Sequence, residues 1–242
     1  MKFIIQTKDG QIIHEFSFAL LESIKYQKWL GNDTIEVLLS DSIWSYNGIL
    51  YPGYIPIGSV DFVTEYLMRY YDKEPKPINI PKQLLDIKWT NRVVFNGTDK
   101  DIVGFKFVKS NDKIKSFAGI CSESPMYIVR PDVAGNYQIS DVMDINSEWR
   151  AFVYKNNLVG LQNYSGQFDL FPDVNKIREM IEVYTESPIA YTLDVAIHGD
   201  NYITSIVEVH DFFSCGLYGF NDYRILPYMH ERWFNEFITK RN

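Results

Sequence analysis

Two neighbouring apolar segments near the carboxyl end of the chain carry acidic residues where buried positions are expected. Residues 190–197 and 202–210 are rich in Ile, Val, Tyr and Thr, and the triplet Gly-Asp-Asn lies between them. This pattern predicts a β-hairpin. Asp194 interrupts the first strand, and Glu208 and His210 interrupt the second. Buried carboxylates are costly unless they are paired or bind a metal, so the pattern indicates a functional site.

The length of the hairpin loop decides whether these side chains share a face. With an odd loop over residues 199–201, Asp194 faces Ile206, and Asp194, Glu208 and His210 project from one face. An even loop places Asp194 on the other face. We take the odd register, which sets Asp194 and Glu208 roughly 7 Å apart at Cα, close enough to hold one divalent cation. The alternative is that both acids are solvated residues of a half-exposed hairpin, and the pattern alone leaves this open.

Composition excludes several classes of protein. The 31 acidic and 24 basic side chains give a formal charge of -7, which argues against broad binding to nucleic acid or to anionic lipid. Cys121 and Cys215 are too few for a disulfide framework, and the N-terminus lacks the zones of a signal peptide. No apolar run approaches the ~20 residues that span a bilayer. We therefore expect a cytoplasmic protein with no membrane partner.

A proline-rich segment suggests where the chain divides. Residues 72–81 include three of the ten prolines, so they cannot form a helix interior or a central strand. We place a domain boundary there, between residues 1–80 and 81–242. The first part is expected to be an α/β unit. Its expected elements are strands at 3–6 and 34–39 and helices at 18–30 and 59–71.

The second part is expected to be rich in strands. Residues 93–108 and 127–154 favour strands. Residues 173–185 and 223–240 favour helices, because their apolar residues recur at helical spacing.

Several motifs are absent or have a simpler explanation. Thr7-Lys8-Asp9-Gly10 is expected to be a hairpin turn, since Asp-Gly is a strong turn dipeptide. The sequence has no Gly-x-x-x-x-Gly-Lys-Ser/Thr phosphate loop and no Cys-x-x-Cys or His-Glu-x-x-His metal motif. Cys121 and Cys215 lie among apolar residues, which disfavours a catalytic thiol.

Two basic segments complement the acidic hairpin. Four lysines lie between residues 106 and 115, a pattern typical of a solvated edge strand. Arg150 opens an apolar strand, where it would ordinarily pair with Glu148 or another acid. Fixed cations near metal-binding carboxylates are, however, also what phosphoryl transfer from a nucleotide requires.

Taken in order, these residues resemble a known family. The series Lys109, Glu148-Trp149-Arg150, Asp194, Glu208-Val209-His210 and Gly216-Leu217-Tyr218-Gly219 is similar to ATP-grasp proteins. Within them it resembles the branch named for two arginines and a lysine, which is common in phages. The resemblance covers about residues 54–233, including a segment at 55–63 similar to the one ahead of that branch's core.

The resemblance implies an α+β fold in which two α+β halves clasp ATP, preceded by a small α/β pre-ATP-grasp domain. In these terms, residues 1–80 are the N-terminal domain and residues 81–242 the ATP-grasp domain. Its two halves would cover about residues 81–144 and 145–242.

The resemblance also implies a nucleotide site. Lys109 would contact the α- and β-phosphates, and Lys115 would lie on the turn that covers the phosphates. The backbone near Asp141, Val142 and Met143 would meet adenine. Arg150 would clamp the γ-phosphate or the acyl-phosphate formed from it, so Lys109 and Arg150 are the catalytic candidates.

By the same resemblance, Asp194 and Glu208 would hold magnesium. His210 stands where such proteins usually carry Asn as a third ligand. Imidazole suits manganese or zinc better than magnesium, so Mn²⁺ is the second candidate metal. Arg232 is the candidate for the branch's other arginine.

The implied activity is that of an ATP-dependent carboxylate–amine or carboxylate–thiol ligase that releases ADP and forms an acyl-phosphate. Its partners would be ATP and a small or peptide-borne carboxylate, in the cytoplasm, or in the host cytoplasm if a phage encodes the protein. One alternative is an ATP-binding module of the same fold that has lost turnover, in which case His210 in place of Asn would reflect that loss. Another is a structural α/β protein in which Asp194 and Glu208 are surface acids.

Overall fold

The computed structural model describes residues 1–44, 52–124, 127–129 and 131–240. The chain forms two compact units. Unit 1 comprises Met1–Glu74, Pro188–Ala190 and Asp211–Asn242, and unit 2 comprises Pro75–Ser187 and Tyr191–His210. The domain boundary that the sequence suggests after residue 80 stays a prediction. No helix in the described ranges is long and apolar enough to cross a membrane.

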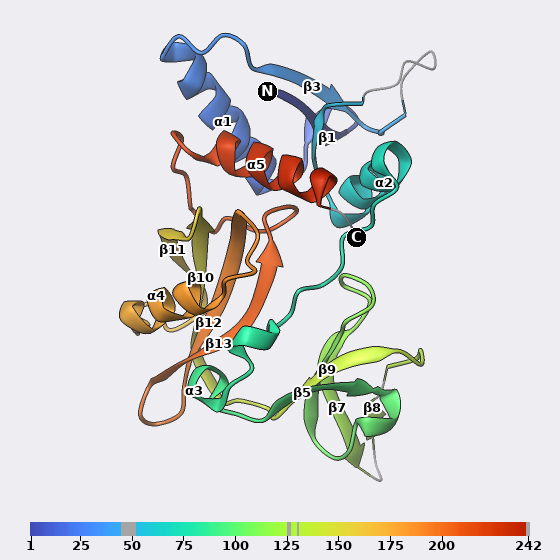
Figure 1. Cartoon of the computed structure of the whole chain (residues 1–242), viewed down its shortest axis with the longest axis vertical. Coiled ribbons are helices and arrows are strands. Elements are labelled where there is room, and N and C mark those ends of the chain that lie inside the picture. The colour runs from blue at the N-terminus through green and yellow to red at the C-terminus, as the bar shows by residue number, and fades with distance from the viewer. Residues whose placement is uncertain (45–51, 125–126, 130, 241–242) are drawn as a thin grey trace. The chain divides into compact units, whose positions relative to one another are not determined.

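Unit 1 is an α/β layer built on its first strand. β1 (Lys2–Lys8) runs parallel to β3 (Glu36–Ser40) and to β4 (Ile55–Ile57), and it pairs antiparallel with β2 (Gln11–Ile12). Three consecutive residues of β1 are fully buried, as expected of a strand covered on both faces. In the described part of this unit the helices are α1 (Glu15–Trp29), α2 (Val60–Tyr71) and α5 (Leu226–Thr239) (Figure 1). The expected α/β unit is confirmed.

Local sequence signals fix several boundaries. Asp9 and Gly10 both have positive φ, 52° and 75°, and join the paired residues Lys8 and Gln11, so the expected Asp-Gly turn is confirmed. Ser59 caps α2 by accepting a hydrogen bond from the Phe62 N–H at 3.2 Å. α1, by contrast, begins three residues before the expected position.

Unit 2 contains a five-stranded sheet of order β5-β9-β6-β7-β8. A small core forms between its strands and the segment after β5, and includes Ile102, Val108 and Ile139. The strands are β5 (Val94–Thr98), β6 (Lys106–Ser110), β7 (Ala118–Ser124), β8 (Tyr127–Val129) and β9 (Asn136–Ser140). Of the short helices, η3 (Asp99–Asp101) follows β5, whereas η2 (Lys82–Leu84) and α3 (Ile87–Thr90) contribute Leu84 and Trp89 to the second core of this unit.

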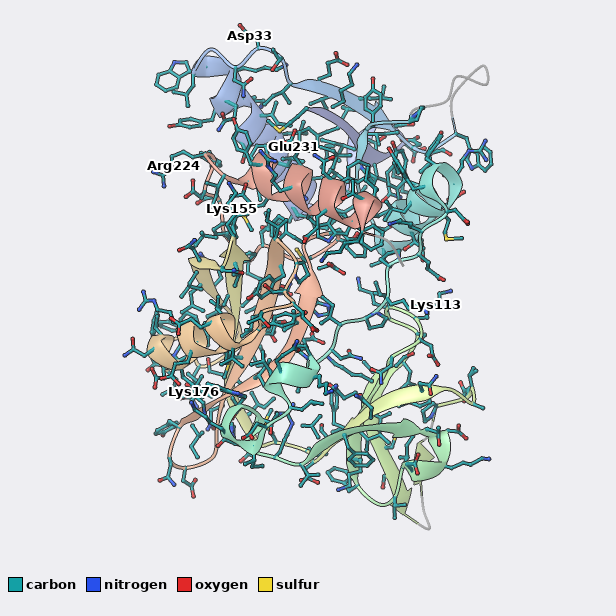
Figure 2. The ribbon with its side chains drawn as sticks, viewed as in Figure 1. Asp33, Lys113, Lys155, Lys176, Arg224 and Glu231 are labelled. Atoms are coloured by element: carbon teal, nitrogen blue, oxygen red, sulfur yellow. The ribbon has the colours of Figure 1, made fainter. Side chains whose placement is uncertain are left out.

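The lysine-rich strand is not an edge strand. β6 is the third strand of the five and pairs with both β9 and β7, so this expectation is wrong. Lys113 lies in the turn that follows β6 (Figure 2). The lysines of this segment therefore divide into solvated residues of the turn and residues of a central strand, one of which is Lys109.

A four-stranded sheet forms the rest of unit 2. Its order is β11-β10-β12-β13, and α4 packs on one face (Figure 1). Asp173 caps α4 by accepting from the N–H groups of Asn175 and Lys176. The elements are β10 (Ile145–Tyr154), β11 (Asn157–Gly166), α4 (Val174–Val183), β12 (Ala190–His198) and β13 (Ile203–Asp211).

The β12–β13 hairpin differs from the expected one in its loop. β12 ends at His198 and β13 begins at Ile203, so the loop has four residues, and Tyr202 belongs to it with φ 52°. The prediction of an odd loop of three residues is therefore wrong. The side chains nevertheless meet: His198 Nε2 lies 2.6 Å from Ser205 Oγ, whereas Asp194 shares a cluster with Glu208. In one regular antiparallel register, residues 198 and 205 cannot share a face if residues 194 and 208 do. The two contacts therefore indicate that the pairing of β12 with β13 shifts by one residue between them.

Candidate functional site

Strand alternation divides the residues of β10 and β12 between the two faces of the four-stranded sheet. Trp149 and Ala151 of β10, and Leu193 and Val195 of β12, belong to the core beneath α4. The residues between them point to the opposite face. Arg150 and Asp194 therefore project together from the face opposite α4.

Arg150 and Asp194 form a buried two-bond ion pair. Arg150 Nε donates to Asp194 Oδ1 at 2.8 Å, and Nη2 donates to Oδ2 at 2.7 Å. The side chains are 8% and 1% exposed. Burial makes this pairing necessary, because an uncompensated charge in an apolar setting is strongly destabilising. The structure thus brings together two predicted site residues, Arg150 and Asp194, as an ion pair.

Lys109, Glu208 and His210 form a second linked group. Lys109 Nζ makes a salt bridge with Glu208 Oε2, and His210 Nε2 lies 2.7 Å from Glu208 Oε1. Burial lowers the pKa of Lys109 to about 8, while the neighbouring carboxylates Asp194 and Glu148 oppose that effect. Lys109 therefore lies inside the acidic cluster rather than at a distance from it.

The donor set fits a divalent cation. Asp194, Glu208 and His210 each offer one ligand atom, and these atoms all lie within 4.8 Å of one another. Metal–ligand bonds of about 2.0–2.6 Å let one ion reach donors at that spacing. Two carboxylate oxygens and an imidazole suit Mg²⁺ or Mn²⁺, with the imidazole favouring the softer ion. Metal binding would share or replace the bonds that these acids make to Arg150 and Lys109.

The remaining predicted residues lie near the five-stranded sheet. Lys115 is exposed on the β6–β7 turn with φ 58°. Asp141, Val142 and Met143 follow β9 and are half-buried. Asp141 pairs with Lys106 at 2.6 Å, and this contact lowers the pKa of its carboxyl. The predicted phosphate and adenine contacts of these residues stay predictions.

Arg92 is a buried cation that the sequence reasoning missed. Its guanidinium donates to the carbonyls of Thr90 at 3.1 Å and Ile206 at 2.9 Å, and to Met143 Sδ at 3.3 Å. Burial lowers its pKa to about 10. The available signal was its position directly before the apolar pair Val93-Val94. Arg232, the suggested second arginine, is exposed on α5 of unit 1.

Tyr164 is the second missed residue. Its hydroxyl donates to Glu148 Oε1 at 3.2 Å, and its ring centre lies 5.6 Å from the Arg150 guanidinium. Burial, together with the charges of Asp194 and Glu148, raises the pKa of its phenol. The pairing of β10 with β11 shifts register beside Glu148, so strand alternation alone could not place Tyr164.

Comparison with models of known protein families shows to which family the chain belongs. The model of the ATP-grasp domain, R2K clade family 2, matches residues 91–227, which is more than half of the chain. The chain belongs to this family. The matched range includes every predicted site residue from Lys109 to His210. No curated protein matches the sequence.

Solved structures agree with the fold of this ATP-grasp chain. ATP-grasp ligase PsnB complexed with minimal precursor has a TM-score of 0.54 and 9% identity, over 96% of this chain and 98% of that one. D-alanine–D-alanine ligase from Bacillus anthracis complexed with ATP has a TM-score of 0.52 and 9% identity, over 100% and 99%. N5-carboxyaminoimidazole ribonucleotide synthetase from Thermotoga maritima has a TM-score of 0.52 and 10% identity, over 96% and 75%. The expected ATP-grasp fold, mixed α+β with 27% helix and 34% strand, is confirmed.

Proposed function

We propose that the protein is an ATP-dependent ligase that joins a carboxylate to an amine or a thiol through an acyl-phosphate. The observation that carries this proposal is the cluster on the sheet face opposite α4. There the buried Arg150 and the half-buried Lys109 lie against three metal-ligand candidates, Asp194, Glu208 and His210. Membership of the ATP-grasp family supports ATP as the nucleotide.

In this proposal the cations bind phosphate. Lys109 contacts the α- and β-phosphates, and Lys115 covers them from its turn. Arg150 binds the γ-phosphate and then the phosphate of the acyl-phosphate. The adenine meets the backbone of residues 141–143, which is half-buried at the end of β9. The catalytic contribution of Lys109 and Arg150 is charge stabilisation, because the charge on the transferring group is spread over its oxygens.

The metal candidates are Mg²⁺ and, because the proposed ligands include the imidazole of His210, Mn²⁺. Asp194, Glu208 and His210 would hold the ion, and when bound it would neutralise phosphate charge. The protein's own part is to keep these three donors within reach of one another.

The proposed reaction has two steps. A substrate carboxylate oxygen attacks the γ-phosphorus, and the bond to the ADP oxygen breaks. An amine nitrogen or thiol sulfur then attacks the carbonyl carbon of the acyl-phosphate, phosphate leaves, and the nucleophile loses a proton. Arg150 stays on the same phosphoryl group through both steps, since that group moves from ADP to the carboxylate. We propose a small or peptide-borne carboxylate as the substrate, and the cytoplasm as the location, in keeping with two free cysteines.

The test is nucleotide release. Purified protein with ATP and Mg²⁺ or Mn²⁺ should release ADP rather than AMP, and the release should rise when the correct carboxylate is supplied. Added hydroxylamine should trap the acyl-phosphate as a hydroxamate. The formation of AMP in place of ADP would refute the acyl-phosphate route.

A second candidate function is an ATP-binding module without turnover. One observation favours it: each acid already bonds a protein cation. The family resemblance, by which such proteins usually carry Asn where this chain has His210, is in keeping with it. It would bind ATP with metal but release no ADP. If a screen of amino acids, peptides and small carboxylates yields no ADP while ATP binds, this candidate replaces the ligase.

A further inference from the structure

The segment Asn79–Ile80 belongs to the proline-rich stretch at residues 72–81 and lies between the two sheets of unit 2. Asn79 is 4% exposed and has φ 53°, a left-handed conformation that Asn tolerates better than most residues. Ile80 is 3% exposed. Neither residue belongs to a helix or strand, so their burial requires partners for their polar groups.

Asn79 bonds the strand neighbours of three site residues. Its backbone carbonyl accepts from the N–H of Val209 at 2.8 Å, and Val209 stands between Glu208 and His210 on β13. Its side-chain Nδ2 donates to the carbonyl of Ser110 at 2.9 Å, and Ser110 follows Lys109 on β6. One residue thus joins the strand that carries Lys109 to the strand that carries its partner.

A second contact holds the same segment from across the sheet. Gln138 of β9 donates from Nε2 to the carbonyl of Ile80 at 2.9 Å, and its Oε1 accepts from the Ile80 N–H at 2.9 Å. Gln138 is also the residue directly opposite Lys109 in the β6–β9 pairing. The neighbour of Lys109 along the chain and its neighbour across the sheet are therefore both tied to Asn79–Ile80.

We infer that Asn79 is a positioning residue that fixes Lys109 against Glu208, with Gln138 supporting it. Lys109 and Glu208 come from different sheets, and neither sheet alone sets the distance between them. The bonds of Asn79 to the backbone of Ser110 on β6 and of Val209 on β13 fix that distance. The part of this inference that concerns ligands rests on the proposed function, whereas the pairing of Lys109 with Glu208 does not.

The variant Asn79→Gly isolates the side chain. Glycine adopts positive φ readily, so the backbone bond to Val209 is kept while the bonds to Ser110 and to Asn111 are lost. Asn91→Gly is the matched control. Asn91 has φ 48° and donates from Nδ2 to Ser205 Oγ at 2.7 Å, a bond that involves neither Lys109 nor Glu208 nor their chain neighbours.

The first measurement is a double-mutant cycle that needs no ligand. Lys109→Met, Glu208→Gln and the double variant are made in three backgrounds: unaltered, Asn79→Gly and Asn91→Gly. Urea unfolding then gives the coupling between Lys109 and Glu208. We expect a favourable coupling in the unaltered and Asn91→Gly backgrounds and a loss of coupling with Asn79→Gly. A coupling that is equal in all three, or absent from the unaltered protein, overturns the inference.

A second background keeps the test decisive if Asn79→Gly fails to fold. Gln138→Met removes both bonds to Ile80 at nearly constant volume, and it should also reduce the coupling. An undiminished coupling in that background would equally overturn the inference.

The second measurement is calorimetric binding of a non-hydrolysable ATP analogue with Mg²⁺. Asn79→Gly should weaken binding by about tenfold, since a displaced lysine loses most of a charge-assisted bond. Asn91→Gly should leave binding unchanged. If the unaltered protein does not bind the analogue, the proposed function fails, and the cycle still decides whether Asn79 positions Lys109.

Discussion

We expect the buried side chain of His230 to make the stability of the protein sensitive to acid. It lies on α5 and is 2% exposed, with its ring 4.7 Å from that of Phe212. Its Nε2 has no hydrogen-bond partner among the described residues. Burial lowers the pKa of His230 from 6.5 to about 3. The folded protein therefore holds a neutral imidazole at pH values where the unfolded chain binds a proton.

The sign and size of the effect follow from linkage. Because the folded pKa is depressed, the stabilising contribution is complete above pH 6.5 and is lost as the pH falls toward 3. Each pH unit below 6.5 costs about 1.4 kcal/mol. At pH 5 the loss should be about 2 kcal/mol, a large share of the stability of an ordinary domain.

The assay is urea unfolding of the protein and of His230→Leu at pH 7.5 and pH 5.0. Other titrating groups contribute equally to both proteins and cancel. Between the two pH values, His230→Leu should lose about 2 kcal/mol less stability than the unaltered protein. Equal losses would show that the imidazole of His230 titrates alike in the folded and unfolded states, and the reasoning from burial would be wrong.

Further predictions concern the site and one helix. Asp194→Asn should abolish metal-dependent ATP binding by calorimetry and also lower the melting temperature, because it removes the carboxylate charge that compensates the buried Arg150 guanidinium. Glu208→Gln should weaken the same binding, and unchanged affinity in both variants would refute the metal site. Arg150→Ala should reduce ADP release more than ATP affinity, whereas the exposed α4 variant Arg178→Ala should change neither. His210→Asn should shift the metal preference from Mn²⁺ toward Mg²⁺ in parallel titrations. Asp173→Ala should cost about 1 kcal/mol in urea unfolding through loss of the α4 cap.

Local chemistry made much of the fold predictable. The Asp9-Gly10 turn, the Ser59 cap of α2 and the Asp173 cap of α4 each depend on residues within a few positions, so their sequence signals are sufficient. The start of α1 was not predictable in this way, because its N-cap residue, His14, makes no side-chain cap bond that the sequence could signal.

The site was less predictable, because its geometry depends on contacts between distant strands. The residues of the acidic cluster could be named from their unusual places in apolar strands. The ion pair of Arg150 with Asp194 could not be specified, since the sequence left open which acid would be its partner. The central position of β6 and the irregular pairing near Tyr164 depend on sheet order and register, which a single sequence does not encode locally.

The two ion pairs of the site, Lys109 with Glu208 and Arg150 with Asp194, affect how metal and nucleotide influence each other's binding. Lys109 and Arg150 offset the charges of Glu208 and Asp194, so a lone divalent cation would meet two positive side chains and a lone triphosphate two negative ones. Each ligand, once bound, would release the side chains that attract the other. We therefore expect metal and nucleotide to bind with positive cooperativity, each raising the affinity for the other by the same factor.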